Sequence, residues 1–374
     1  MDFIDLKTQY KRIEKSLDPK LKDIMSNARF IMGAEVIELE SQLARYTGRK
    51  HCISCSSGTD ALVMPLMASG IGKGDAVFVP TFTFFSTAEV VSFVGATPIF
   101  VDVYEDTFNI DTEKLEEAIR YIKEKSDLTP KAVIPVDLFG QPAKLPDLQN
   151  ICDSHNLILI EDAAQGFGGS IGDRRACSFG DFSSTSFFPA KPLGCYGDGG
   201  AVFTDNDEYA GLLKSIRVHG QGQGDDKYSN VRIGINGRLD TIQAAVLLEK
   251  LKIFDDEIIK KNEIAQKYTS RLSDYVKTPC VNDGYYSSWA QYTIVVSANK
   301  REKVAQALKE NEIPTAIYYK KPIHTLDIYK ELEYIKHMNY GVSEKLSETV
   351  LSLPMHAYLQ DEDINLICQT IAKA

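Results

Sequence analysis

The sequence lacks long apolar runs, an export signal and an excess of positive charge. A membrane-spanning helix needs about 20 mostly apolar residues, and no stretch of the 374-residue chain comes near that composition. The first residues, MDFIDLK, do not combine a basic segment with an apolar one, as a signal peptide would. We therefore expect a cytoplasmic protein with no signal peptide and no membrane association.

The chain also has fewer basic than acidic residues. Its 42 Lys and Arg against 52 Asp and Glu give a formal net charge of −10. Binding to nucleic-acid phosphates relies on a basic face, so we expect no nucleic-acid partner. The seven cysteines are an odd number, and without an export signal they predict reduced thiols rather than a disulfide framework.

Two nucleotide-binding motifs and a metal motif are missing as well. The segment 72–74, GKG, lacks the upstream glycine and the Ser or Thr of a Walker P-loop. No G-x-G-x-x-G follows an expected strand, so the dinucleotide fingerprint is absent. Cys52 and Cys55 form a C-x-x-C pair, but a zinc site would need a second pair. Because this pair lies inside an expected strand, alternation would place the two thiols on opposite faces, and we expect structural cysteines and no metal site.

The chain does contain a regular alternation of short apolar runs and helical patterns through its first two-thirds. Runs that are apolar throughout, such as 157–160, fit strands that are covered on both faces in a parallel sheet. This alternation is typical of a layered α/β domain. The expected strands are 51–54, 76–80, 98–102, 132–135, 157–161, 183–187 and 201–204, and the expected helices are 60–68, 87–94, 112–124, 145–155 and 208–218.

The pattern changes near residue 239. Residues 239–268 predict one long amphipathic helix, with Leu247, Leu248, Leu251 and Phe254 on one stripe. A strand at 290–296 and a helix at 303–311 are expected beyond it. We therefore expect a large α/β domain over residues 1–245 and a small α+β domain over 246–374, packed closely because no Pro/Gly/Ser-rich linker separates them.

The segment SSGTDAL, residues 56–62, follows an expected strand and opens an expected helix. Its glycine permits close approach of a ligand to the backbone, and the free N–H groups at a helix N-terminus favour an anion such as phosphate. Ser or Thr before a helix is also an ordinary cap. This segment is therefore a candidate phosphate cradle or a simple helix start.

Two further segments place reactive side chains at strand ends. Asp162 ends an expected buried strand, at the edge where open α/β sheets bind ligands. A carboxylate there needs a cation, either on a ligand or on a structural arginine, and Gln165 could point into the same cleft. Lys191 lies between a strand and a loop with four glycines in nine residues. A lysine in an apolar site has a lowered pKa and can serve as nucleophile and proton carrier.

These segments, in this order, resemble the fold type I pyridoxal-phosphate (PLP) enzymes. They are most similar to the DegT/DnrJ/StrS-type aminotransferases, which act on nucleotide-linked keto sugars. The resemblance spans essentially the whole chain and includes FIDLK at 3–7, FIMG at 30–33, PTFTF at 80–84, GINGRLD at 234–240 and SLPMH at 352–356. It implies a fold type I large domain, with a mostly parallel seven-stranded sheet sandwiched by helices, and a small C-terminal α+β domain.

The resemblance also implies a role for each matching residue. Lys191 and Asp162 are the implied catalytic residues: Lys191 matches the Schiff-base lysine, and Asp162 matches the carboxylate that keeps the pyridine nitrogen protonated. Gln165 matches the residue that bonds the phenolic oxygen, and Phe84 matches the aromatic that stacks on the ring. The implied phosphate contacts are Gly58, Thr59, Ser186 and Asn236. Because Asn236 matches a residue from the neighbouring subunit, the resemblance implies a homodimer with shared active sites.

Within this family, the segments 187–200 and 236–245 are similar to those of enzymes that aminate a UDP-2-acetamido-3-keto-hexuronic acid. Arg238 matches the arginine that meets the sugar carboxylate there, although a dimer-interface salt bridge is an alternative role. Tyr318 and Tyr319 stand where the family suggests a His-Tyr pair. We expect these two tyrosines and Phe30 to help bind the substrate.

The resemblance implies transfer of an amino group from L-glutamate to the keto sugar by a ping-pong reaction, in the synthesis of amino sugars for lipopolysaccharide or another polysaccharide. The same chemistry on a 4-keto-6-deoxy nucleotide sugar is an alternative, and the nucleotide, UDP or dTDP, stays open. A PLP-dependent sugar dehydratase is disfavoured because such enzymes have His where this chain has Lys191. A non-catalytic regulator that binds PLP is the remaining alternative.

Overall fold

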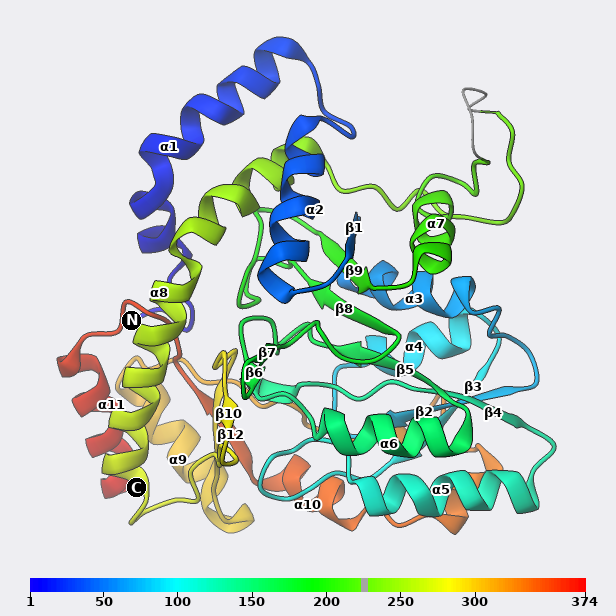
Figure 1. The fold of residues 1–374 in the computed structure, drawn as a ribbon. Coiled ribbons are helices and arrows are strands. Elements are labelled where there is room, and N and C mark those ends of the chain that lie inside the picture. The colour runs from blue at the N-terminus through cyan, green and yellow to red at the C-terminus, as the bar shows by residue number, and fades with distance from the viewer. Residues whose placement is uncertain (223–227) are drawn as a thin grey trace.

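In a computed structural model, the protein is described over residues 1–222 and 228–374. Its centre is a seven-stranded sheet with the order β1-β9-β8-β5-β4-β2-β3 (Figure 1). Within this sheet β9 runs antiparallel to both of its neighbours, and the other adjacent pairs are parallel. The predicted α/β fold is therefore confirmed. The strands of this sheet are β1 (His51–Cys55), β2 (Asp75–Pro80), β3 (Thr97–Val101), β4 (Thr129–Val133), β5 (Ile158–Asp162), β8 (Phe182–Ser186) and β9 (Gly200–Thr204).

Helices cover both faces of the sheet (Figure 1). One core joins the sheet to five helices and includes Leu62, Leu115 and Leu213. A second core joins the sheet to α1, α2 and the first half of α8, and it includes Val36 and Leu247. Strands covered in this way must be apolar on both sides. The helices of the first core are α3 (Gly58–Ala68), α4 (Ser86–Phe93), α5 (Thr112–Lys125), α6 (Leu145–His155) and α7 (Asp207–Ile216), and those of the second are α1 (Leu6–Asn27), α2 (Ala34–Thr47) and α8 (Thr241–Leu272).

Cys52 and Cys55 lie on opposite faces of β1, as the alternation predicts. The Cys52 side chain belongs to the core beneath α2, and the Cys55 side chain belongs to the core beneath α3. Both are buried, and burial raises the pKa of each thiol above its usual value. Two thiols that face away from each other cannot act as a redox pair, which fits the structural role expected for them.

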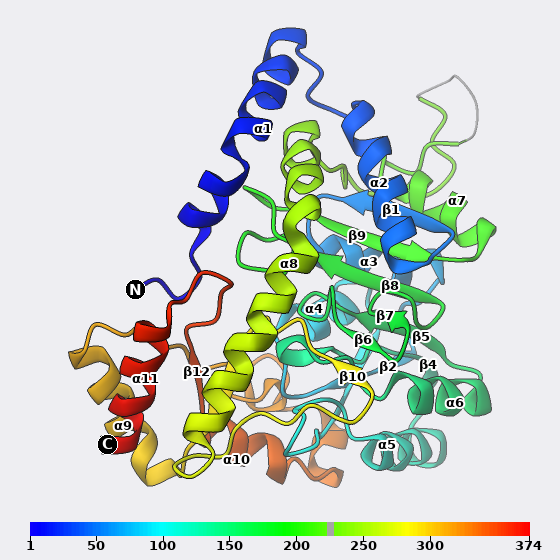
Figure 2. The same cartoon turned by 60° about the vertical axis from the view of Figure 1, so that its left-hand side comes forward.

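The C-terminal part of the chain forms a third core around the second half of α8. This core joins Tyr268, Tyr292 and Leu308 with the last helix, and Figure 2 shows α8 running from the large sheet down to it. The division predicted at residue 245 stays a prediction, since α8 runs through that position and contributes to two cores. The remaining elements are β6 (Ser170–Ile171), β7 (Arg174–Arg175), β10 (Tyr285–Tyr286), β11 (Tyr292–Val295), α9 (Ala298–Glu310), α10 (Gly341–Thr349), β12 (Val350–Leu353) and α11 (Asp361–Lys373).

All the strands and helices expected between residues 51 and 311 are found, with ends shifted by a few residues at most for nearly all of them. The long helix predicted at 239–268 is α8, and the strand predicted at 290–296 is β11. Two helices, α1 and α2, precede the first expected element. Over residues 1–222 and 228–374, no helix is long and apolar enough to cross a membrane.

Candidate active site

A cavity of about 780 Å³ lies at one edge of the large sheet. Its walls come from the segments that follow β1, β2, β5 and β8, which are strands that run in the same direction and so end at the same edge. The C-terminal part adds one wall through residues 317–323. The cavity brings together nine of the predicted site residues: Gly58, Thr59, Phe84, Asp162, Gln165, Ser186, Lys191, Tyr318 and Tyr319.

The start of α3 forms one end of this cavity. Ser57 caps the helix, and its side chain accepts a hydrogen bond from a backbone N–H of the first turn at 3.0 Å. The N–H groups of Gly58 and Thr59 have no carbonyl partner within the helix, so they present the positive end of the helix dipole. A Cβ on Gly58 would lie 2.5 Å from the Ser186 Cβ. Only glycine therefore allows α3 and β8 to approach this closely around an anion.

Asp162 ends β5 at the opposite wall and is 5% exposed. Its carboxylate accepts hydrogen bonds from the Ala164 N–H and the Thr87 hydroxyl, each at 3.1 Å. Burial raises the pKa of Asp162, while these two hydrogen bonds and the charge of Lys191 lower it. The carboxylate is thus held in place but lacks a directly bonded cation among the residues described.

Lys191 lines the cavity on a turn that follows β8. Burial lowers the pKa of its amine, and the charge of Asp162 opposes that shift. The turn is closed by a hydrogen bond from the Lys191 N–H to the Phe188 carbonyl at 2.8 Å. A Cβ on Gly194 would lie 2.4 Å from the Pro189 carbonyl oxygen. The turn therefore has no room for a side chain at position 194. A lowered pKa favours the neutral amine, which is the form that acts as nucleophile and base.

Gln165 is held by contacts on both ends of its side-chain amide. Its oxygen accepts the Phe139 N–H at 2.8 Å, and its nitrogen donates to the Tyr319 hydroxyl at 3.3 Å. The Phe139 N–H requires an acceptor, so it fixes which way the amide points. The predicted substrate residue Tyr319 thus also orients Gln165. Phe84 lies across the cavity with 54% of its surface exposed, as a ring that is available for stacking would be.

Two predicted residues, Asn236 and Arg238, lie in a second cavity of about 430 Å³. Within the part of the chain that the structure describes, the Arg238 Nε is buried there without a hydrogen-bond partner. Asp198 lines both cavities. Phe30 lines neither of them: its carbonyl accepts the Thr241 N–H at 2.9 Å, and its neighbour in the chain lines the second cavity.

Three residues of the site were not predicted. Thr87 bonds Asp162, Ser86 lies 2.9 Å from Thr59 through their hydroxyl oxygens, and Asp198 joins the two cavities. Thr87 and Ser86 are polar residues at the start of α4, after β2, so their place at a strand end was a usable signal. Asp198 stands in a glycine-rich loop, where sequence spacing gives no direction for a side chain.

The first cavity therefore combines an anion cradle, an amine nucleophile, a buried carboxylate and an exposed aromatic ring. These groups suit a flat, phosphorylated ring compound with a carbonyl group and a basic nitrogen. Its volume lies in the usual range of about 300–1,000 Å³ for small-molecule sites.

Comparisons with known proteins agree with this chemistry. The chain is 42% identical to the UDP-2-acetamido-2-deoxy-3-oxo-D-glucuronate aminotransferase of Pseudomonas aeruginosa, over 99% of each chain. Among solved structures, it matches a DegT DnrJ EryC1 StrS aminotransferase from Brucella abortus with a TM-score of 0.96 and 48% identity, covering 100% of this chain and 99% of the other. It also matches NtdA from Bacillus subtilis with bound cofactor PMP (TM-score 0.87, 27% identity), covering 96% of this chain and 81% of the other.

The family match extends over nearly the whole sequence. Residues 11–372 match the DegT/DnrJ/EryC1/StrS aminotransferase family. The match includes every element that lines the first cavity and both residues predicted from the second. The predicted family and fold type are confirmed by this match together with the Brucella abortus structure. The chain belongs to the DegT/DnrJ/EryC1/StrS aminotransferase family.

Proposed function

We propose that this protein is a PLP-dependent aminotransferase that transfers an amino group from L-glutamate to a nucleotide-linked 3-keto sugar. The observation that carries the proposal is the single cavity in which Lys191 and Asp162 interact electrostatically beside the start of α3. The family and the PMP-bound structure of NtdA support the same cofactor.

The residues of the cavity fit PLP. The tight approach of Gly58 to Ser186 leaves a cradle of N–H and hydroxyl groups for the phosphate. Asp162 is a buried carboxylate in need of a cation, which a protonated ring nitrogen supplies. Phe84 offers a face for the ring, and the fixed Gln165 amide offers a donor for the ring hydroxyl. PLP held here acts as an electron sink for bonds to the Cα of an amino acid.

Lys191 is the group that moves the proton during amino transfer. It would take the proton from the Cα of the donor, because burial lowers the pKa of its amine and favours the neutral base. Asp162 would keep the ring nitrogen protonated, held by Thr87 and Ala164. Tyr318 and Tyr319 would close the cavity from the C-terminal side and keep water from the reacting atoms.

The proposed sugar substrate is a UDP-2-acetamido-3-keto-hexuronic acid or a closely related 3-keto sugar. The name of the Pseudomonas aeruginosa relative supports this class. Lys320 and Lys321 line the cavity and provide local positive charge for the diphosphate. Such local recognition is needed because the net charge of −10 would otherwise repel an anionic substrate. We further propose a cytoplasmic role in making amino sugars for a surface polysaccharide.

The second cavity supports a homodimer with shared active sites. Asn236 and Arg238 lie outside the cavity that holds Lys191, and the Arg238 Nε lacks a partner. Large apolar side chains around them are exposed: Val231 and Ile233 in the same segment, and Phe30 and Ile31 in the segment that pairs with Asp240. Exposed apolar groups of this kind mark a contact surface. We propose that this surface meets a second copy, so that Asn236 reaches the partner's phosphate and Arg238 reaches the partner's sugar carboxylate.

A panel of nucleotide sugars tests the substrate. The purified protein with PLP and L-glutamate would be offered UDP-3-keto, UDP-4-keto and dTDP-keto sugars, and products would be identified by mass and NMR. We expect amination of the UDP-3-keto-hexuronic acid, and none by Lys191→Ala, whereas Lys73→Ala at an exposed lysine serves as control. Amination of 4-keto sugars alone contradicts the proposed substrate class.

Mixing two inactive variants tests the shared site. Lys191→Ala and Arg238→Ala, unfolded together and refolded, form hybrid dimers with one intact site if each site uses residues from both copies. Random pairing then restores about a quarter of the wild-type activity. No restored activity, with both variants folded and dimeric, contradicts the sharing of Arg238.

A further inference from the structure

Two carboxyl groups lie completely buried beside Asp162. Glu161 precedes it on β5, and Asp137 follows the neighbouring strand β4; both side chains are 0% exposed. The backbones meet here, because the Asp137 N–H donates to the Asp162 carbonyl at 3.0 Å and Val136 forms a parallel bridge with Asp162. Neither carboxyl lines the cavity, and the aminotransfer reaction as described uses neither.

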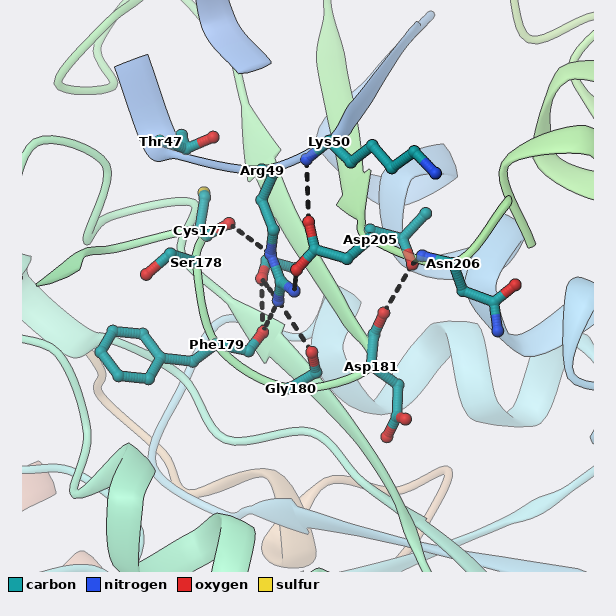
Figure 3. Close-up of polar contacts among 12 residues, drawn as sticks. Thr47, Arg49, Lys50, Cys177, Ser178, Phe179, Gly180, Asp181, Asp205 and Asn206 are labelled. Atoms are coloured by element: carbon teal, nitrogen blue, oxygen red, sulfur yellow. Dashed lines mark hydrogen bonds and ion pairs between the residues drawn. The ribbon is translucent and has the colours of Figure 1, made fainter. Parts of the chain in front are cut away.

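Glu161 is surrounded by donors. Its two carboxylate oxygens accept the backbone N–H groups of Cys177 at 2.8 Å and Phe179 at 3.1 Å. Carbonyl groups of the same segment point toward Arg49 (Figure 3). The Arg49 guanidinium donates to the carbonyls of Cys177 at 3.3 Å, of Gly180 at 2.8 Å, and of Phe179. The segment 177–180 therefore links an arginine to a carboxylate through its backbone, which suits an ionised Glu161.

Asp137 has a different environment. One of its oxygens accepts the Ala143 N–H at 2.9 Å, while the other, Oδ2, is buried and has no donor among the described residues. The backbone of Gly166 closes the space beside this oxygen, since a Cβ on Gly166 would lie 2.3 Å from it. Because Val136 pairs in parallel with Asp162, the flanking Asp137 and Glu161 direct their side chains to the same face of the sheet, where the charge of Glu161 raises the pKa of Asp137. An oxygen without a donor thus faces a second carboxylate, and only a proton between the two can make that contact favourable.

We propose that Asp137 is a protonated acid that donates its Oδ2 hydrogen to the Glu161 carboxylate, and that this pair positions Asp162. The two groups then hold one proton and one negative charge. Two negative charges at bonding distance in a buried site would be strongly unfavourable. The burial of Asp137 and the charge of Glu161 both raise the pKa of Asp137, in agreement with this assignment.

The charged and titratable groups around the pair are few. Burial raises the pKa of Glu161, and its hydrogen bonds and the charge of Arg49 oppose that shift. Cys177 lies beside both carboxyls, and Asp162 and Tyr285 face Asp137. Arg49 supplies one positive charge, which it also shares with the Asp205 carboxylate at 2.7 Å, so it cannot balance two buried carboxylates as well. The pair therefore adds only one negative charge next to Asp162. It also ties the ends of β4 and β5 together beneath it.

The role of Asp162 in this inference rests on the proposed function, but the shared proton does not. Asparagine at position 137 can donate from its amide nitrogen to Glu161 and accept the Ala143 N–H through its oxygen. Glutamine at position 161 replaces one of the two acceptor oxygens of Glu161 with an NH₂ group. That NH₂ group would face a backbone N–H that needs an acceptor, or the Asp137 acid would lose the carboxylate to which it donates. The two isosteric substitutions should therefore behave differently.

The test compares Asp137→Asn, Asp137→Ala and Glu161→Gln. Infrared difference spectra of the protein at about pH 8, roughly four units above the usual aspartate pKa, should show a protonated carboxylic acid that Asp137→Asn removes. In the holoenzyme, the pH titration of the cofactor absorbance and the PLP affinity should stay close to wild type in Asp137→Asn. Both should change in Glu161→Gln and Asp137→Ala, with PLP affinity at least about tenfold weaker.

The shared proton is refuted if wild type lacks the acid band, or if Asp137→Asn leaves that band in place. The positioning role is refuted if the cofactor titration of Asp137→Ala matches wild type. Should Glu161→Gln fail to fold, the infrared comparison of wild type with Asp137→Asn still decides the first question, and Asp137→Ala decides the second. The infrared band is measured without any substrate. A failure of the proposed aminotransfer would therefore leave the band unchanged, and it could be distinguished from a failure of the shared-proton proposal.

Discussion

Replacing Gly58 with alanine probes the contact between α3 and β8 that forms the phosphate cradle. The added Cβ would lie 2.5 Å from the Ser186 Cβ and 3.2 Å from its Cα, so a backbone element must move. Overpacking of this kind costs about 1–3 kcal/mol. The higher helix propensity of alanine than of glycine offsets at most about 1 kcal/mol of this cost. We expect a net loss of about 1–2 kcal/mol in the free energy of unfolding of the apoprotein.

The same substitution should also weaken PLP binding. If Ser186 and the start of α3 move apart, the cradle loses phosphate contacts, and a loss of about 1.4 kcal/mol corresponds to tenfold weaker affinity. Gly211→Ala is the matched control, because Gly211 lies within α7 and a Cβ there meets nothing within 4 Å. It should raise the free energy of unfolding by up to about 1 kcal/mol and leave PLP affinity unchanged.

Urea unfolding of the apoproteins and fluorescence titration with PLP measure the two effects separately. We expect Gly58→Ala to lower both stability and affinity, and Gly211→Ala to lower neither. If Gly58→Ala binds PLP as tightly as wild type and is as stable as Gly211→Ala, the close approach of α3 and β8 does not form the cradle, and the reasoning is wrong.

Three further predictions concern the buried polar groups and the thiols. Arg49→Ala should lower the free energy of unfolding by about 3–5 kcal/mol, because it leaves several buried carbonyls unpaired. Asp205→Ala should lower it by only about 1 kcal/mol, because the Asp205 side chain is 59% exposed. Urea unfolding measures both changes. The pKa of Asp137 is raised in the folded state, so the stability it contributes is complete below about pH 4 and is lost as the pH rises. The stability of Asp137→Asn relative to wild type should therefore rise by about 1.4 kcal/mol per pH unit until the folded-state pKa is reached, and a flat difference across neutral pH would contradict the protonated acid. A thiol reagent should modify Cys280 rapidly in the native protein and the other six cysteines after unfolding, because those six are buried; rapid modification of several thiols before unfolding would contradict the described packing.

The elements of the large sheet were predictable because their physics is local. A strand covered on both faces must be apolar, so β2, β5 and β9 can be identified without knowing their neighbours. The helices α1 and α2 gave no such signal, since they precede the alternation, and α1 contains Pro19 in its interior. Packing against α8 stabilises these two segments as helices, and the local sequence pattern does not indicate that packing.

The main site was predictable for a related reason. Asp162 and Lys191 stand at or just after strand ends, and parallel strands bring those ends to one edge. The positions of Asn236 and Arg238 depend instead on a loop that folds away from this edge, so spacing alone could not place them in a second cavity. The shared proton of Asp137 and Glu161 depends on contacts between β4, β5 and residue 166, which are distant in the sequence.

The central claim is that Lys191 performs amino transfer on PLP bound in the first cavity. The most direct test adds L-glutamate, without any sugar, to the purified holoenzyme and measures 2-oxoglutarate. We expect about one 2-oxoglutarate per bound PLP, as the first half of a ping-pong reaction requires, and none from Lys191→Ala. A wild-type protein that binds PLP but releases no 2-oxoglutarate, or a Lys191→Ala protein that releases as much, would contradict it.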